Sequence, residues 1–437
     1  MHYRVLAGLA ILATAIQSSA TNAQSVWCDA SDCDAYCDCS TGGRDAPDGW
    51  YQHTERVCDR WDEIRRSLED GGIKFEGGIS QFYQGVSSGG LQHKFRYGGH
   101  GDYEAGFDFG RMCGLDGFTI ELGAEHRFAE TVNLATGSVI LVAVAPSIPS
   151  PTTNDLALTK VRFAYEVVDN VEVFLGKIDA LEETTNAFAD GNGTERFFAT
   201  PFNFYAISVR TIPFSTLAAG FNVIRDDERM FTLAVLNTKD TATTVGISDL
   251  FANGAAIFSE LRLPLTIRGR RGHQAIGGSW SSATFTSLAQ EGRIDFPDIP
   301  IAKKEGSWSL FWSGDQYLWQ DPCDGKRGWG LFGEAGISDG NPNPIQWSLT
   351  FGVGGNSPLQ GREDDRFGIG WYYVGISDEF GLGQLTDPID DGQGIELFYD
   401  IAMSERFRLA FDLQFVDPTL ARADTAVVPG MRGRIDF

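Results

Sequence analysis

The chain has 437 residues and a formal net charge of −24, with 52 Gly and 31 Phe but only 5 Met. Because phosphate binding requires a basic face, this charge argues against nucleic acid as a partner. Abundant glycine and aromatic residues with few methionines favour strands and turns over helices.

Residues 1–23 have the pattern of a secretory leader. His2 and Arg4 precede an apolar run over residues 5–16, and small polar residues follow it. We expect cleavage after Ala23. The run is about twelve residues, too short to cross a bilayer as a helix, and no later stretch reaches 18 uncharged apolar residues. The sequence therefore excludes a helical membrane protein.

Residues 24–53 form an acidic segment that is rich in cysteine. In an exported chain the default state of cysteine is the disulfide, with a metal cluster and free thiols as alternatives. Because the chain has seven cysteines, at least one is unpaired or forms an intermolecular bond. The disulfide candidates are Cys28, Cys33, Cys37, Cys39, Cys58, Cys113 and Cys323.

Residues 54–72 are expected to form a short periplasmic helix. Val57, Trp61, Ile64 and Leu68 recur at helical spacing, and two glycines end the run. Both a packing helix and a constriction at the periplasmic mouth fit this pattern.

Residues 73–437 alternate apolar and polar side chains at every second position, as in "RFRLAFDLQF" from Arg406. Such alternation is typical of strands. Sixteen segments follow it: 74–83, 103–112, 117–127, 159–169, 171–178, 215–224, 229–237, 254–264, 271–281, 306–317, 328–337, 345–355, 365–376, 393–402, 406–415 and 427–437.

The connections between these segments indicate a membrane barrel. Most tight turns fall on one rim and most long loops on the other, which is typical of outer-membrane barrels with their long loops outside the cell. A soluble sandwich also alternates, but its outer faces are polar, whereas a closed barrel turns its apolar face to lipid and its charged face to water. The sequence therefore predicts an all-β fold, a 16-stranded transmembrane antiparallel β-barrel over residues 73–437.

Because successive residues of a strand point to opposite faces, the alternation assigns many polar side chains to the lumen. Arginines beside carboxylates suit neutral polyols, because both groups form hydrogen bonds to vicinal hydroxyls, and the aromatic residues Phe332, Tyr372 and Phe398 would stack on a sugar face. Taken singly, each charged residue is better explained as a structural ion pair. The candidates along the solute path are Glu121, Glu125, Arg127, Lys160, Arg162, Glu166, Glu334, Tyr372, Glu396, Arg408, Asp412, Gln414, Arg432 and Arg434. Loops 128–158 and 179–214 are both candidates to narrow the lumen.

Several stretches resemble the carbohydrate-selective porins of the OprB type. They are "GWGLFGEAGISDGNPNPIQW", "REDDRFGIGWYYVGISD", "GIELFYDIAMSERFRLAFDLQFVDP" and "GMRGRIDF", and "RWDEIRRSLEDGGIKFEGGISQFYQG" is similar to the family's helix and first strand. The resemblance implies a sixteen-stranded outer-membrane barrel that admits glucose and other sugars by diffusion. The acidic cysteine-rich segment departs from the family's pattern.

We therefore predict an outer-membrane porin for sugar diffusion into the periplasm, with a general or cation-preferring porin as the alternative. A barrel hydrolase or an adhesive barrel is the alternative of another class. Ser87 matches G-x-S-x-G but lacks the strand-to-helix elbow, and no histidine has a metal-binding spacing, so no enzyme activity, cofactor or metal is expected. The expected partners are sugars, outer-membrane lipid and the barrel-assembly machinery, which would recognise Phe437. The chain is expected to be a monomer or a homotrimer.

Overall fold

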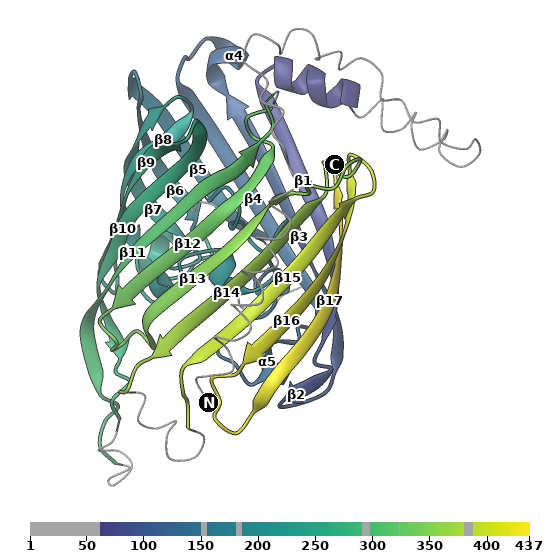
Figure 1. The fold of residues 1–437 in the computed structure, drawn as a ribbon. Helices are drawn as coiled ribbons and strands as arrows, with labels where there is room; N and C mark the ends of the chain where they lie inside the picture. The colour runs from purple at the N-terminus through teal and green to yellow at the C-terminus, as the bar shows by residue number, and fades with distance from the viewer. Residues whose placement is uncertain (1–61, 150–154, 181–185, 291–297, 323, 380–387) are drawn as a thin grey trace. The chain divides into compact units, whose positions relative to one another are not determined.

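The computed structural model describes residues 62–149, 155–180, 186–290, 298–322, 324–379 and 388–437. The chain divides into two compact units, and the larger comprises Trp50–Gln320 and Lys326–Phe437. This larger unit contains all the strands of the described residues, and they form one sheet that closes into a barrel (Figure 1).

Sixteen long strands run antiparallel, each paired with the next along the chain, and β17 pairs with β1 to close the ring. A short strand, β2 (Ser88–Gly90), lies beside β17. The long strands are β1 (Ile73–Gly85), β3 (Phe95–Asp108), β4 (Phe118–Ala129), β5 (Ala157–Val168), β6 (Val171–Asp179), β7 (Ser215–Arg225), β8 (Glu228–Asn237), β9 (Ala255–Ile267), β10 (Arg270–Thr286), β11 (Lys303–Gln320), β12 (Gly328–Ser338), β13 (Ile345–Asn356), β14 (Arg366–Ile376), β15 (Gly392–Ala402), β16 (Phe407–Asp417) and β17 (Asp424–Asp436).

The predicted sixteen-stranded barrel is confirmed, and each predicted segment overlaps one strand. The largest difference concerns the second segment, predicted at 103–112, because β3 ends at Asp108. There the Asp108 carboxylate accepts two backbone N–H groups of α4 (Phe109–Cys113), at 2.9 and 3.2 Å, and so caps a helical turn. This local cap ends the strand. At its other end β3 begins at Phe95 and not at 103, which makes the first loop shorter than expected.

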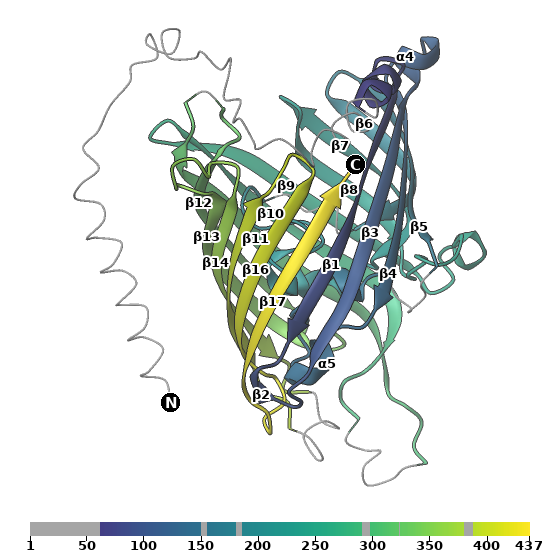
Figure 2. The same ribbon diagram turned by 90° about the vertical axis from the view of Figure 1, so that its right-hand side faces the viewer.

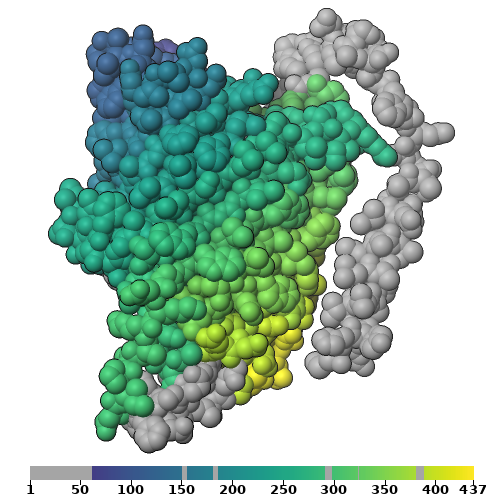
Figure 3. Space-filling model, turned by 90° about the vertical axis from the view of Figure 1, so that its left-hand side faces the viewer, coloured from purple at the N-terminus to yellow at the C-terminus, as the bar shows by residue number. Residues whose placement is uncertain are grey.

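The outer face of the barrel is apolar. Along β16, Phe407, Phe411 and Phe415 are 37%, 47% and 41% exposed, while the alternate residues Asp412 and Gln414 are buried. In a bilayer, hydrocarbon covers such a face, and closure of the ring leaves no strand edge with unpaired amides. Figure 3 shows this wall as a continuous outer surface on one side of the barrel. The described helices include none that is long and apolar enough to cross a membrane.

Of the helix expected over residues 54–72, the structure describes residues 62–72; residues 62–70 are helical, and Gly71 and Gly72 form a turn. Arg406, in the turn before β16, forms an ion pair with Asp62 of this helix. The leader, the acidic segment and six of the seven cysteines lie outside the described residues. Cys113 was a disulfide candidate, but it is a free and exposed thiol at the end of α4, and its Sγ donates to the carbonyl of Phe109.

Candidate functional site

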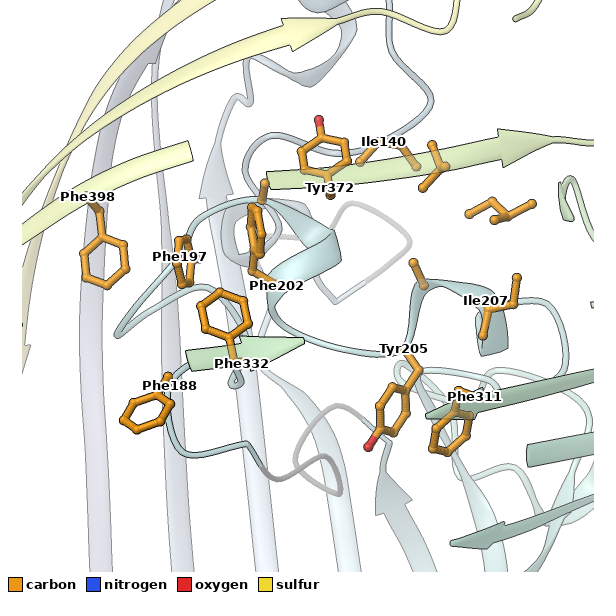
Figure 4. Close-up of a cluster of buried hydrophobic side chains, with 14 of the residues drawn as sticks. Ile140, Phe188, Phe197, Phe202, Tyr205, Ile207, Phe311, Phe332, Tyr372 and Phe398 are labelled. Atoms are coloured by element: carbon orange, nitrogen blue, oxygen red, sulfur yellow. The ribbon is translucent and has the colours of Figure 1, made fainter. Parts of the chain in front are cut away.

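The segment between β6 and β7 lies inside the barrel. We call its residues 186–214 the inner loop, which includes the short 3-10 helices η2 (Thr200–Phe202) and η3 (Ala206–Ser208). Apolar side chains of this loop are buried against the inner faces of β11 to β15 (Figure 4). They are Phe188, Phe197, Phe202, Tyr205 and Ile207.

Aromatic contacts attach the inner loop to the wall. The Phe197 ring stacks on Phe202 at 4.4 Å between centroids, and it meets the wall residues Phe332 and Phe398 edge to face at 5.4 and 4.8 Å. Figure 4 shows these four rings as one group. Offset and edge-to-face pairs of this kind contribute about 0.5–1.5 kcal/mol each beyond the area that they bury. The inner loop therefore packs against the wall in the way that side chains pack in a protein core.

Glycines in the wall make room for the rings. Gly352 pairs with Gly370, and Gly354 pairs with Gly368, so the inner faces of β13 and β14 carry glycine side by side. A Cβ at Gly370 would lie 2.4 Å from the Phe202 ring, and a Cβ at Gly368 would lie 2.6 Å from the Phe197 ring. No side chain larger than hydrogen fits at these two positions without moving the loop.

Two charged side chains hold the backbone of the inner loop. Glu396 on β15 accepts the N–H groups of Phe198 and Ala199 at 2.5 and 3.0 Å. Arg432 on β17 donates to two loop carbonyls at 2.9 and 3.0 Å and to Asp400 at 3.3 Å. Its guanidinium also lies 4.6 Å from the centre of the Phe198 ring. Hydrogen bonds to charged groups are the strong ones, so these contacts fix the position of the loop.

A second inward segment follows β4. The Asn133 side chain accepts the N–H groups of Val142 and Ala143 at 2.9 and 3.0 Å, which folds residues 130–149 onto themselves. From the wall, Gln414 donates to the carbonyl of Val142 at 2.8 Å. Both loops that the sequence offered as candidates therefore fold inward.

The facing wall, from β4 to β8, carries an ionic ladder. Arg162 donates to Glu121 at 2.9 Å and forms an ion pair with Glu172. Asn222 donates to Glu172 at 2.9 Å, and Thr232 donates to Asn222 at 2.9 Å. Five neighbouring strands thus present one connected row of polar groups, the ionic ladder, inside the barrel. The carboxylate oxygens of such a row can accept hydrogen bonds from hydroxyl groups.

Tyr205 links the inner loop to the adjoining strand of this wall. Its hydroxyl donates to Glu260 of β9 at 3.0 Å. Burial raises the pKa of Tyr205 well above its usual value near 10, so the phenol keeps its proton and remains a donor. The inner loop therefore extends from the aromatic side of the lumen to the start of the ionic side.

A cavity of about 500 Å³ opens at the rim of the short turns. The inner loop contributes Glu195 to its lining, and Arg366 on β14 donates to Glu195 at 2.8 Å. Arg434 holds Asp102 through two hydrogen bonds of 2.8 and 2.9 Å on the opposite side. This cavity has charged walls and leads to the inner loop.

The structure places the predicted path residues in different surroundings. Glu121 and Arg162 belong to the ionic ladder, and Lys160 lies beside Glu104 at 3.4 Å. Glu166, by contrast, is exposed at the turn rim and accepts the N–H of Asn170. The remaining charged candidates near the inward loops or in ion pairs are Glu125, Arg127, Glu334, Arg408 and Arg434.

Other predicted path residues lie under the inward loops. Tyr372 is 1% exposed, with its ring 5.7 Å from that of Phe202, so it contacts the inner loop and presents no face for a sugar to stack on. The buried Phe332 and Phe398 are covered by the same loop. Glu396, Asp412, Gln414 and Arg432 are also buried, and they bond to the loops or to one another.

Sequence reasoning missed several residues of this site. Glu172 and Asn222 complete the ionic ladder, Glu195 brings a carboxylate from the loop, and Arg366 holds it. A signal existed in "RFGIGWYYVGI", where glycine occupies successive inward positions that would otherwise carry side chains. Within the described residues, no group of three or more metal-ligating side chains is present.

Comparisons with known proteins agree with this architecture. Solved structures that resemble the chain include the high-pH form of Pseudomonas putida OprB, at 17% identity over 86% of this chain and 97% of that chain, with a TM-score of 0.73. The low-pH form of the same protein gives 14% identity, 86% and 96% coverage and a TM-score of 0.52. The outer membrane channel DcaP of Acinetobacter baumannii is 11% identical over 84% of this chain and 97% of that chain, with a TM-score of 0.50.

No curated protein sequence matches the chain. Residues 92–437 match the family described as "Carbohydrate-selective porin, OprB family". This match covers most of the barrel, including the inner loop, the glycine-lined wall and the ionic ladder. The chain therefore belongs to the OprB family of carbohydrate-selective porins and is an outer-membrane sugar porin.

Proposed function

We propose that sugars cross this barrel between the inner loop and the ionic ladder. The observation that supports this path is the division of the lumen into two sides. The inner loop covers the aromatic side at β11 to β15, whereas on the side of β4 to β8 the ladder carboxylates Glu121 and Glu172 remain partly exposed and Arg162 is buried beneath them. A sugar in this passage meets these carboxylates, which Arg162 holds in place and which accept hydrogen bonds from its hydroxyls in place of water.

The turn-rim cavity is the proposed exit of this path. In the proposed orientation, the short turns face the periplasm and the long loops face outward, as is usual for outer-membrane barrels. We further propose that residues 1–23 direct export and that Phe437 serves recognition during barrel assembly. The Phe437 ring lies 6.1 Å from the ring of Tyr103, and both residues occupy lipid-facing positions in the alternation of apolar and polar residues.

Replacing Arg162 with Gln is expected to slow glucose uptake by roughly three- to tenfold, because Glu121 and Glu172 lose the side chain that positions them. This factor corresponds to the loss of about one net hydrogen bond between a carboxylate and the sugar. Liposome swelling with glucose and with a zwitterionic solute of similar mass measures this effect. Wild-type channels should admit glucose faster than the zwitterion, and Arg162→Gln should reduce that difference.

Arg225→Gln is the matched control, because Arg225 is the exposed last residue of β7 and pairs with Asp226 of the following turn. It should leave the glucose rate unchanged. Equal rates for solutes of one mass in wild-type channels would instead support the alternative of a general diffusion porin. The hydrolase alternative has less support, because Ser87 lies between β1 and β2 and donates to the carbonyl of Val427 at 3.0 Å.

A further inference from the structure

The loop between β8 and β9 folds over the outside of the barrel. We call its residues 241–247 the outer arch. The segment stands out from the wall beside β5 in Figure 2. Thr241 begins the arch by donating its backbone N–H to the carbonyl of Ser215 at 2.7 Å. Gly246 closes it with φ +81, where a Cβ would lie 2.8 Å from the Thr241 side chain.

Lys177 of β6 anchors the outer arch. It has the same parity as the exposed Leu175, so its side chain leaves the barrel on the lipid-facing side. Its ammonium group donates to the carbonyl of Leu158 at 2.6 Å and to three arch carbonyls at 2.6, 3.4 and 3.0 Å. A charge on this face is costly unless it is hydrogen-bonded, and here four carbonyl oxygens surround it. The arch is therefore held firmly against the outer wall.

A groove of about 650 Å³ lies between the outer arch and the strands. Its apolar lining comes from both sides, and most of these side chains are open to the exterior: Val245 is 72% exposed and Phe163 is 41% exposed. Thr243 and Thr244 of the outer arch also line the groove. The charged residues Asp155 and Lys177 also line it. The other large apolar lining residues are Leu156, Leu158, Val161, Leu217 and Ile247.

We infer that this groove binds the acyl chain of a membrane lipid. The groove is continuous with the outer face of the barrel, and hydrocarbon already covers that face in an outer-membrane porin. In lipid, association depends on close van der Waals packing, and a groove with walls on two sides supplies more contacts than an open strand surface. The threonine hydroxyls of the outer arch suit the ester groups that join an acyl chain to its headgroup.

Native mass spectrometry of the delipidated full-length protein, mixed with a phosphatidylglycerol of defined chain length, tests this site. The wild type is expected to retain one lipid. Leu217→Trp should fill the groove and weaken retention by roughly tenfold. Leu261→Trp is the matched control, since Leu261 is an outward leucine on β9 outside the groove and is 44% exposed. It should retain the lipid as the wild type does.

Lys177→Met provides a second test that does not fill the groove, because it frees the outer arch and should also lower lipid retention. Heat-modifiable mobility on a gel verifies that each variant has folded. Equal lipid retention in all variants, or no lipid retention in the wild type, would overturn the inference. The inference would also fail if the spectrum showed the mass of a dimer that Leu217→Trp abolishes, because a second copy of the chain would then occupy the groove. Glucose swelling should be the same in Leu217→Trp and the wild type, so this result is independent of the proposed sugar path.

Discussion

Replacing Arg432 with Met is expected to release the inner loop and widen the channel. Arg432 is buried, and it is a charged donor to two loop carbonyls and to Asp400. Each such hydrogen bond contributes about 1.5–3 kcal/mol, so the variant loses most of the polar attachment of residues 193–196. Planar lipid bilayers should show a higher conductance that fluctuates, and liposome swelling should show a larger exclusion limit.

Arg408→Met is the control for this experiment. Arg408 donates to the same Asp400, at 3.2 Å, but its other contacts are the backbone carbonyls of Asp364, in the turn after β13, and Asp400. Each variant thus leaves Asp400 with one arginine, and only the Arg432 variant loses contact with the inner loop. Arg408→Met should keep the exclusion limit of the wild type. An unchanged exclusion limit in Arg432→Met would show that other contacts hold the loop.

The strands of this barrel could be predicted from sequence because the solvent differs on the two sides of the wall. Each strand must alternate to meet lipid and water, and that requirement acts on every residue separately. The error at the end of the second segment arose from a local event, the capping of α4 by Asp108. The alternation of apolar and polar residues does not show where a side chain such as Asp108 caps a helical turn and so ends the strand.

The arrangement of the lumen was less predictable, because parity identifies inward residues without showing what covers them. Glu396 and Arg162 both occupy inward positions of their strands, yet Glu396 lies beneath the inner loop and Arg162 belongs to the ionic ladder. The contact that separates them joins Phe198 to Glu396 across 198 residues. Only the inward glycines of β13 and β14 left a trace of it in the sequence.

Gly370→Val is expected to displace the inner loop from the aromatic wall. A Cβ at this position would lie 2.4 Å from the Phe202 ring, so the ring must move. Overpacking of this kind costs about 1–3 kcal/mol, and the barrel strands themselves need not change. Limited proteolysis should therefore cut the inner loop, while heat-modifiable mobility remains that of a folded barrel. Gly333→Val is the control, since its nearest neighbouring atom would lie 3.4 Å away.

Phe202→Ala removes the other partner of the contact between Phe202 and Gly370. Removing a buried phenylalanine ring costs about 3–5 kcal/mol and leaves a cavity above Gly370. This variant should also expose the inner loop to protease and raise the exclusion limit in liposome swelling. Phe351→Ala is the control, because it removes the same ring from the lipid-facing side, where Phe351 is 53% exposed. The inner loop should stay protected in that control.

The double variant Gly370→Val with Phe202→Ala tests whether these two residues act through one contact. The valine side chain would occupy part of the space that the ring leaves, so the double variant should protect the inner loop better than either single variant does. Residues in direct contact show interaction energies of about 0.5–3 kcal/mol in such a cycle, whereas independent sites add. If the effects of the two single variants on the proteolysis rate simply added in the double variant, the glycines of β13 and β14 would not position the inner loop. Partial rescue would establish that the missing side chains of β13 and β14 position the constriction.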